Sequence, residues 1–378
     1  MPLLKISALL LVLIGLGFAV AFGTGTLRLV TAGYPPALWP ASAPFETVPG
    51  TPQPIPRRPM PIELDDRGME LFEASGGRAL LVMHDDQLAL ETYQERIGPG
   101  TRMNSYSLVK SLVGALILRA HAEGKIGSLE DPVGMYLHGI GSDAFQMRPL
   151  RSFLTMRSGL ELEADGSDKQ GRLRQVNPLG NLARLHAHGL SGIEERLAVA
   201  KGNEDRFSYQ NVNTAVLRQV LFNVYRQPVH NLLAEKIWQP AGAGDAFWLR
   251  HPESGDVTAY CCLYATARDW ARVGSYLMKN GTPRKSFLPE GLWSDYFDRG
   301  LSGKELAGDV YGLHVRHNVL DRQGEDLQGP FTYMMGQGGQ IVYMMPEKNL
   351  VVVRFGKRHA LLHSTLYSVW NSLSAPET

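Results

Sequence analysis

The chain has 378 residues, enough for one large domain or two ordinary ones, and its hydrophobic and charged fractions of 44% and 20% are typical of a globular protein. Its 38 basic and 37 acidic residues give a formal charge of +1 without a basic stretch or an acidic tail, so nucleic acid is not an expected partner. The sequence contains no P-loop or dinucleotide fingerprint, and no cofactor is predicted.

The N-terminal segment is the first predicted element. Lys5 is followed by an uncharged run over residues 6–27, which ends at Arg28 and is long enough to cross a bilayer as a helix. Ala19-Val20-Ala21 is similar to a cleavage signal, so residues 1–28 are predicted to be a signal anchor or a removed signal peptide. The length of the run favours the uncleaved anchor. Both alternatives predict export to the periplasmic or extracellular side, with the membrane as a partner of this segment.

The next stretch, residues 29–65, contains ten prolines and is predicted to be an extended linker without regular structure. A folded domain is predicted over residues 66–378. Its first elements are expected to be a short helix at residues 68–75 and a hairpin with strands at 79–83 and 88–93.

The rest of the domain is predicted to be helical in its middle and to return to strands at its end. Residues 126–300 are expected to form the helical, loop-rich subdomain. Strands at both ends of the domain, with helices between them, predict one sheet built from both termini. The expected helices lie at residues 108–122, 150–156, 211–225, 229–237, 265–279 and 359–373, and the expected C-terminal strands at 311–315, 340–345 and 350–355.

The helix predicted at residues 108–122 carries the first candidate site. It is apolar on almost every side, yet Lys110 lies in its first turn, three residues after Ser107 and on the same face. A serine hydroxyl needs a base to become a strong nucleophile, and burial would favour the neutral amine of Lys110, which can act as that base. The alternative is a helix-capping serine followed by a lysine that reaches the surface.

The second candidate site is Tyr209 with Asn211, just before and at the start of the helix predicted at 211–225. The pair can present a phenol and an amide to one cleft, and a phenol close to an ammonium group is easily held as phenolate, which is a competent base. The alternative is a packed tyrosine beside a capping asparagine.

The third candidate site is the glycine-rich segment from Gly336 to Gly339, which leads directly into the strand predicted at 340–345. Glycines there allow a ligand to approach the sheet edge closely. The backbone N–H of Gln337 could form an oxyanion hole together with the N–H of Ser107. The alternative is a flexible turn.

These three motifs, in this order, resemble the serine β-lactamase and penicillin-binding-protein superfamily. The Tyr-x-Asn form is similar to that of class C β-lactamases and related esterases, and Leu154 to Leu160 resembles the family's Leu-Thr-Met-x-Ser-Gly-Leu signature. The segments from Ile237 to Gly242 and from Ala265 to Asp269 are similar to the 6-aminohexanoate-dimer hydrolase branch. The resemblance implies an α+β fold with an antiparallel sheet flanked by helices, an all-helical subdomain and a site between them.

The resemblance also implies roles for the site residues. Ser107 would be the acylated nucleophile, and Lys110 and Tyr209 would share proton transfer. Asn211 would position the substrate or Lys110. The N–H groups of Ser107 and Gln337 would bind the oxyanion.

One position departs from the pattern of the resembled family. Its Lys-Thr-Gly or His-x-Gly triplet falls on Met334-Met335-Gly336, so Gly336 would line the substrate site but the cation that holds a β-lactam carboxylate is absent. This absence argues against efficient β-lactamase or transpeptidase activity and leaves ester and amide hydrolysis open.

The expected function is therefore an exported serine hydrolase that cleaves a small ester or amide through an acyl-enzyme on Ser107. One alternative is a peptidoglycan-directed D-amino-acid amidase or carboxypeptidase, or a weak β-lactamase. A second alternative is a catalytically silent binding or scaffold protein of the same fold. The expected partner is a small-molecule substrate, and the oligomeric state is left open.

Metal and disulfide sites are not predicted. No H-E-x-x-H motif occurs, and no histidine pair has a third ligand at a matching spacing. Adjacent cysteines cannot easily meet ordinary disulfide geometry, so Cys261 and Cys262 are expected to be buried small side chains, with a nucleophilic cysteine as the alternative. The histidine pairs considered are His186 and His188, His314 and His317, and His359 and His363.

Overall fold

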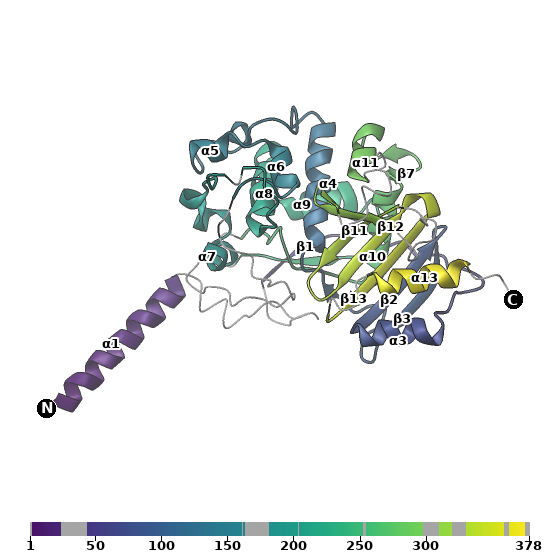
Figure 1. Ribbon diagram of the computed structural model, residues 1–378, viewed down its shortest axis with the longest axis horizontal. Helices are drawn as coiled ribbons and strands as arrows, with labels where there is room; N and C mark the ends of the chain where they lie inside the picture. Colours follow the sequence, from purple (N-terminus) through teal and green to yellow (C-terminus); the bar gives the residue numbers. More distant parts are fainter. Residues whose placement is uncertain are drawn as a thin grey trace.

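A seven-stranded antiparallel sheet lies at the centre of the protein in a computed structural model, in the order β3-β2-β13-β12-β11-β10-β9 (Figure 1). The structure describes residues 2–23, 44–160, 162, 181–202, 204–251, 255–297, 310–319, 330–358 and 363–374. β13 lies between β2 and β12, so both ends of the domain build one sheet, as predicted. The strands are β2 (Gly77–His84), β3 (Gln87–Tyr93), β9 (Val310–Gly312), β10 (Val315–Val319), β11 (Pro330–Gly336), β12 (Gln340–Met345) and β13 (Leu350–Gly356).

One face of this sheet is covered by α3 (Asp66–Ala74) and α13 (Ser364–Ser374), which lie side by side in Figure 1. Their apolar side chains form one core cluster with Leu80 and Val82 of β2. Because side chains alternate along a strand, Leu81, which lies between these two residues, points to the opposite face.

The opposite face of the sheet packs against α10 (Ala267–Met278) and against α4 (Leu108–Ala122), which carries the first candidate site. Leu81 and Val353 belong to the core cluster on this side. The predicted α+β fold, with an antiparallel sheet flanked by helices, is confirmed by this arrangement.

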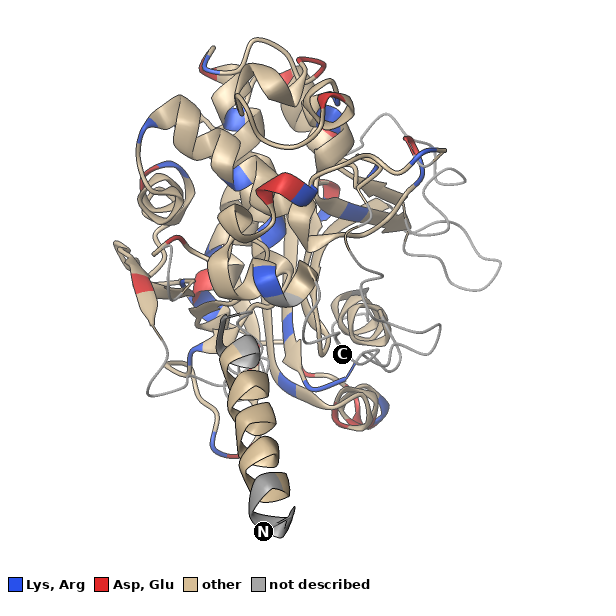
Figure 2. Cartoon of the chain, turned by 90° about the vertical axis from the view of Figure 1, so that its left-hand side faces the viewer, with Lys and Arg blue, Asp and Glu red and all other residues tan. Residues whose placement is uncertain are grey.

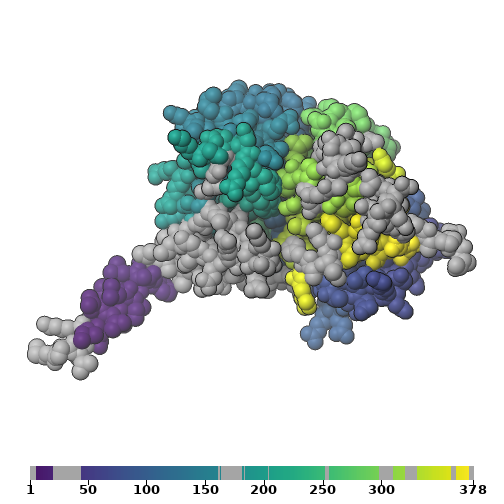
Figure 3. Space-filling view, in the orientation of Figure 1, coloured from purple at the N-terminus to yellow at the C-terminus, as the bar shows by residue number. Residues whose placement is uncertain are grey.

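The helical part lies beside the sheet, in the blue and teal colours of Figure 3. α8 packs along α4 and α6, so α4 is shared between the helical part and the sheet. The helices are α5 (Asp143–Gln146), α6 (Leu150–Leu154), α7 (Asn181–His188), α8 (Asn211–Tyr225), α9 (Val229–Leu233), the π-helical turn η4 (Ala234–Trp238) and, on the sheet side, α11 (Glu290–Tyr296). Short 3-10 turns occupy Val133–Met135, Leu190–Gly192, Glu194–Arg196 and Pro346–Lys348.

A second, four-stranded sheet has the order β1-β5-β6-β4, and a two-stranded ribbon is formed by β7 (Gly281–Thr282) and β8 (Lys285–Ser286). Neither sheet was predicted, because their strands have only two to four residues each. The four strands are β1 (Phe45–Val48), β4 (Met103–Asn104), β5 (Ala246–Leu249) and β6 (Leu263–Ala265).

β1 corrects the prediction that residues 29–65 form a linker without regular structure. Pro44 and Pro49 flank the strand but none lies inside it, so its N–H groups can pair with β5. The chain after β1 stays attached, because Thr51 N–H donates to a carbonyl oxygen of the helical part, that of Ala243. Residues 29–43 lie outside the described residues.

The strand predicted at 311–315 is a hairpin instead. β9 and β10 are joined by Leu313 and His314, whose φ angles of 50° and 68° belong to the left-handed region. Neither residue is a usual turn residue, so the sequence carries no turn signal here. Tertiary contacts hold the turn, since His314 N–H donates to Leu154 O at 2.9 Å and Ser111 Oγ donates to His314 O at 2.5 Å.

The two ends of the chain also differ from the expectations. The final helix begins at Ser364, and residues 359–362 of the predicted helix lie outside the described residues. The N-terminal α1 spans Pro2–Gly23, and residues 24–27 of the predicted anchor lie outside the described residues. Among the described residues, no helix is both long and apolar enough to cross a membrane, and the anchor predicted at residues 6–27 is not borne out.

Candidate active site

Ser107 lies where the small sheet meets α4. Ser105 N–H donates to Leu263 O of β6 at 2.9 Å, and Tyr106 N–H donates to Asn104 Oδ1 at 2.9 Å, so the chain before Ser107 is held on two sides. Tyr106 has a φ of 45°, a strained value that turns the chain sharply just before the helix. Ser107 is half-buried and its hydroxyl makes no capping hydrogen bond. The capping alternative therefore does not describe this serine.

Lys110 is the only charged residue in the first turn of α4, and its side chain is 1% exposed. Its Nζ lies 3.0 Å from Ser107 Oγ, 2.7 Å from Asn211 Oδ1 and 2.8 Å from the carbonyl oxygen of Tyr260. The amide oxygen and the carbonyl oxygen can only accept hydrogen bonds. A neutral amine has two N–H donors for these two acceptors, and its lone pair is then left for the Ser107 hydroxyl proton. The surroundings of Lys110 thus suit a base directed at Ser107.

Tyr209 and Asn211 enter the site from the helical part. Asn211 is the first residue of α8, and its side chain bonds to Lys110. The ring centre of Tyr209 lies 5.0 Å from Lys110 Nζ, within the range of a cation–π contact. The structure therefore brings both predicted residues to Lys110, but the Tyr209 phenol makes no hydrogen bond to Ser107 or Lys110 within the described part of the chain.

Gly336 brings the third motif to Ser107. It ends β11, and a Cβ atom added there would lie 2.1 Å from Ser105 O and 3.2 Å from Ser107 N. Gln337 follows, and its carbonyl oxygen accepts a hydrogen bond from the Gln340 side chain at 2.9 Å, which holds the turn after β11. The backbone N–H groups of Ser107 and Gln337 are thus carried by neighbouring, well-held segments.

Replacing Gly336 with alanine is expected to lower kcat/KM by at least about 10²-fold, since a displacement of about 1 Å at a reacting group has that effect. The methyl group cannot be accommodated without moving the backbone of Ser105 or of β11. Ester hydrolysis and the melting temperature would be measured together. Gly291→Ala is the control, because a Cβ there has no atom within 4 Å. Full activity of Gly336→Ala would contradict the close approach of β11 to Ser107.

Met334 occupies the place where the resembled family has a cation, and it is fully buried in the core cluster that contains α4 residues. A cation that was not predicted lies nearby on β10. Arg316 stacks at 5.3 Å on the ring of Tyr311 and at 6.0 Å on the ring of Tyr209. No sequence motif marks Arg316, because its position depends on the unpredicted β9–β10 hairpin.

The histidines close to the site are uncharged at neutral pH. Burial lowers the pKa of His314 and that of His186 to about 3, with smaller effects from neighbouring positive charge. Neither imidazole therefore adds charge beside Lys110. Among the described residues, no group of three or more histidine, cysteine or acidic side chains is placed to hold a metal ion.

The two cysteines precede β6, next to the residue whose carbonyl bonds Lys110. Both are buried, as predicted, but their sulfurs lie within bonding distance as a disulfide between neighbouring residues, which was not predicted. Cys262 has a φ of 75°, so the chain turns tightly and brings the two side chains together. Tyr260 and Tyr264 beside them are 1% and 0% exposed and pack in the core.

Comparison with known proteins gives one family model, described as beta-lactamase, that matches residues 70–363. A 6-aminohexanoate-dimer hydrolase of Paenarthrobacter ureafaciens is 23% identical over 280 residues, which cover 73% of this chain and 71% of the relative.

Many solved structures share the fold, among them the following two. A Bacillus anthracis protein described as a 6-aminohexanoate-dimer hydrolase has a TM-score of 0.70 and 21% identity, with 88% of this chain and 89% of the other covered. A D-stereospecific amidohydrolase from Streptomyces sp. has a TM-score of 0.59 and 15% identity, with 80% and 97% covered. These similarities lie in the superfamily that the three motifs resemble, and they confirm that resemblance.

Proposed function

Because the chain belongs to the beta-lactamase family of serine hydrolases, we propose that it cleaves a small ester or amide through an acyl-enzyme formed on Ser107. The observation that carries this proposal is the position of Lys110 Nζ, 3.0 Å from Ser107 Oγ and held by two acceptors. A general base has to lie within about 2.6–3.2 Å of the group whose proton it takes.

In the proposed reaction, Ser107 Oγ attacks the substrate carbonyl carbon and its proton passes to Lys110 Nζ. The N–H groups of Ser107 and Gln337 stabilise the negative oxygen of the tetrahedral intermediate. The C–O or C–N bond then breaks, and the leaving group takes the proton from Lys110. Water attacks the acyl-enzyme in the same way and releases a carboxylic acid and free Ser107. Tyr209 is proposed to share the proton transfers and Asn211 to position Lys110.

Amides are the favoured substrate class within this proposal. The names of two relatives refer to 6-aminohexanoate dimers, and that of a third to a D-stereospecific amidohydrolase. Met334 is buried and apolar, which disfavours strong binding of a β-lactam carboxylate at this strand. Linear amides of ω-amino acids and amides of D-amino acids are therefore the first substrates to test.

The test is the intact mass of the protein before and after treatment with a fluorophosphonate, followed by peptide mapping. One adduct located on Ser107, together with hydrolysis of a simple ester, would support the proposal. No adduct and no turnover of any ester or amide would overturn it and leave the silent scaffold of the same fold. Acylation by penicillin would instead favour the peptidoglycan-directed alternative.

We also propose that the protein is exported. Lys5 followed by the apolar residues from Ile6 to Ala19 and by Ala19-Val20-Ala21 has the order of parts found in a signal peptide. Fractionation of cells that express the full chain, with N-terminal sequencing of the product, tests this. A product found only in the cytosol with an intact N-terminus would contradict export.

A further inference from the structure

A cavity of about 630 Å³ opens at one end of the seven-stranded sheet, and it is called the basic cavity below. It is formed by Glu73 near the end of α3, residues 76–78 at the start of β2, residues 94–97 after β3, and Lys357 and Arg358 after β13. Pockets that bind small molecules in proteins have volumes of about 300–1,000 Å³. The basic cavity is therefore large enough for an organic end group.

The charge of the basic cavity favours an anion. Four cationic side chains face two carboxylates, a net charge of +2, and none of the four makes an ion pair with another described residue. Over the rest of the chain, acidic and basic side chains are interspersed (Figure 2). Guanidinium and ammonium groups bind carboxylates through charge-assisted hydrogen bonds. The charged residues are Arg78, Arg96, Lys357, Arg358, Glu73 and Glu95.

The basic cavity and Ser107 lie at the same end of the sheet. β11 ends at Gly336 against Ser107, and β13 ends at Gly356, which pairs with Gly77 at the start of β2. β13 and β2 are two and three strands from β11, which at about 4.8 Å per strand corresponds to roughly 10–15 Å. A linear chain with the length of about three or four extended residues spans this distance.

Tyr106 directly precedes Ser107, and its phenol interacts electrostatically with Arg78 of the basic cavity. Burial raises the pKa of the Tyr106 phenol, and the Arg78 guanidinium opposes this increase. This interaction agrees with the strand spacing, which puts the basic cavity within reach of a linear substrate at Ser107.

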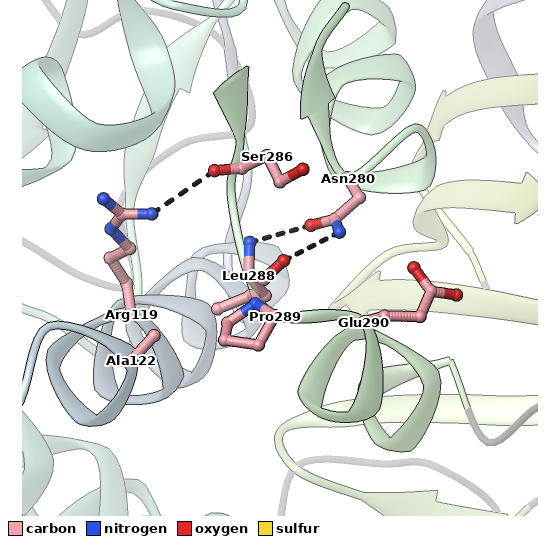
Figure 4. Close-up of a pocket in the computed structure, with 7 residues that line it drawn as sticks. All are labelled: Arg119, Ala122, Asn280, Ser286, Leu288, Pro289 and Glu290. Carbon is pink, nitrogen blue, oxygen red and sulfur yellow. Dashed lines mark hydrogen bonds between the residues drawn. The ribbon is translucent and has the colours of Figure 1, made fainter. Parts of the chain in front are cut away.

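A second cavity, of about 340 Å³, does not have these properties. It lies at the far end of α4, and Figure 4 shows hydrogen bonds that join Asn280 to Leu288 and Arg119 to Ser286. The Asn280 amide makes two hydrogen bonds of 2.8 Å with the backbone of Leu288, and Arg119 pairs with Glu123. Arg119, the only cation among the residues that line this cavity, is already paired with a carboxylate of the protein.

Building on the proposed hydrolase function, we propose that the basic cavity binds the carboxylate at one end of a linear substrate whose ester or amide bond reacts at Ser107. β11 itself carries no cation, and the cations of β2 and of the chain after β13 add to the positive charge of Arg316 on the neighbouring β10. The substrates are then anionic chains, such as amides or esters of linear ω-amino or dicarboxylic acids.

Two series of esters test the proposal, one with the carboxylate on the acyl side and one with it on the leaving-group side. The first contains mono-p-nitrophenyl esters of linear dicarboxylic acids of increasing length, and the second contains acetate esters of ω-hydroxy acids. Each compound is compared with its methyl-capped, neutral counterpart. In one of the two series, the anionic ester of the best length is expected to have a kcat/KM at least about 10-fold higher than its methyl-capped counterpart. This is the effect expected from one charge-assisted hydrogen bond.

The double variant Arg78→Gln and Lys357→Gln is expected to lose this preference while hydrolysing p-nitrophenyl acetate at the wild-type rate. A control variant with Arg284→Gln and Lys285→Gln also removes one arginine and one lysine, but from the exposed ribbon of β7 and β8. This control is expected to keep the preference for the anionic ester. Equal kcat/KM for anion and capped ester in both series, or a preference that survives in the cavity variant, would overturn the subsite. Failure of the wild type to hydrolyse any ester or amide, with no fluorophosphonate adduct on Ser107, would instead overturn the proposed function.

Discussion

A Ser107→Ala variant is expected to lose at least about 10⁴-fold in kcat/KM for ester hydrolysis, because removing the nucleophile of a serine hydrolase removes the whole covalent route. It is also expected to give no fluorophosphonate adduct. The hydroxyl is half-buried and free of a capping bond, so its loss leaves the start of α4 intact. Turnover and intact mass would be measured on the same preparation as the melting temperature.

Ser111→Ala is a matched control for this variant. The same hydroxyl group is removed from the same helix, but Ser111 Oγ donates to His314 O and does not contact Lys110. A loss of about 1–3 kcal/mol in the free energy of unfolding is expected from the unpaired carbonyl, with turnover retained. Turnover by Ser107→Ala close to that of Ser111→Ala would show that hydrolysis does not pass through Ser107.

Replacing Lys110 with methionine is expected to reduce kcat/KM by about 10²–10⁴-fold, the usual contribution of a general base. Methionine has a similar length but no proton acceptor for the Ser107 hydroxyl. Fluorophosphonate labelling should give the same adduct on Ser107 at a much lower rate, because the nucleophile is present but not activated. The rate of labelling therefore separates the role of Lys110 from that of Ser107.

Two comparisons sharpen the Lys110 result. Lys125→Met removes an ammonium group just beyond the other end of α4, where the side chain is exposed, and should leave turnover unchanged. The double variant Ser107→Ala and Lys110→Met should be no slower than Ser107→Ala alone, because two residues that act as a unit have non-additive effects. Wild-type labelling kinetics in Lys110→Met would contradict its assignment as the base.

The pairing of Ser107 with Lys110 could be predicted because it is local. Residues three apart on a helix face the same side, and the observed distance of 3.0 Å follows from that spacing. Asn211 is 101 residues from Lys110 along the chain, and only the resemblance to a family brought it into the site. The sequence alone left open whether Asn211 bonds to the substrate or to Lys110. The answer depends on how α8 packs along α4, which places the Asn211 side chain against Lys110.

Other parts of the site and fold have no signature in the sequence. The third partner of Lys110 is the backbone carbonyl of Tyr260, and any residue type supplies such an oxygen. β1 forms because its backbone pairs with β5, which lies about 200 residues further along the chain. The prolines around β1 suggest instead an extended linker without partners. The turn at Leu313 and His314 is held by contacts with α4 and α6, which local preferences cannot reveal.

The position of β13 between β2 and β12 has a consequence for how the chain folds. Val352 pairs with Val82, so neighbours in the middle of the sheet are 270 residues apart. Contacts of such high sequence separation make folding slow, because a long loop must close before they form. A chain still being synthesised cannot complete the sheet until β13 (Leu350–Gly356) is available to pair with β2 and β12. The protein is therefore expected to gain its activity only late in synthesis.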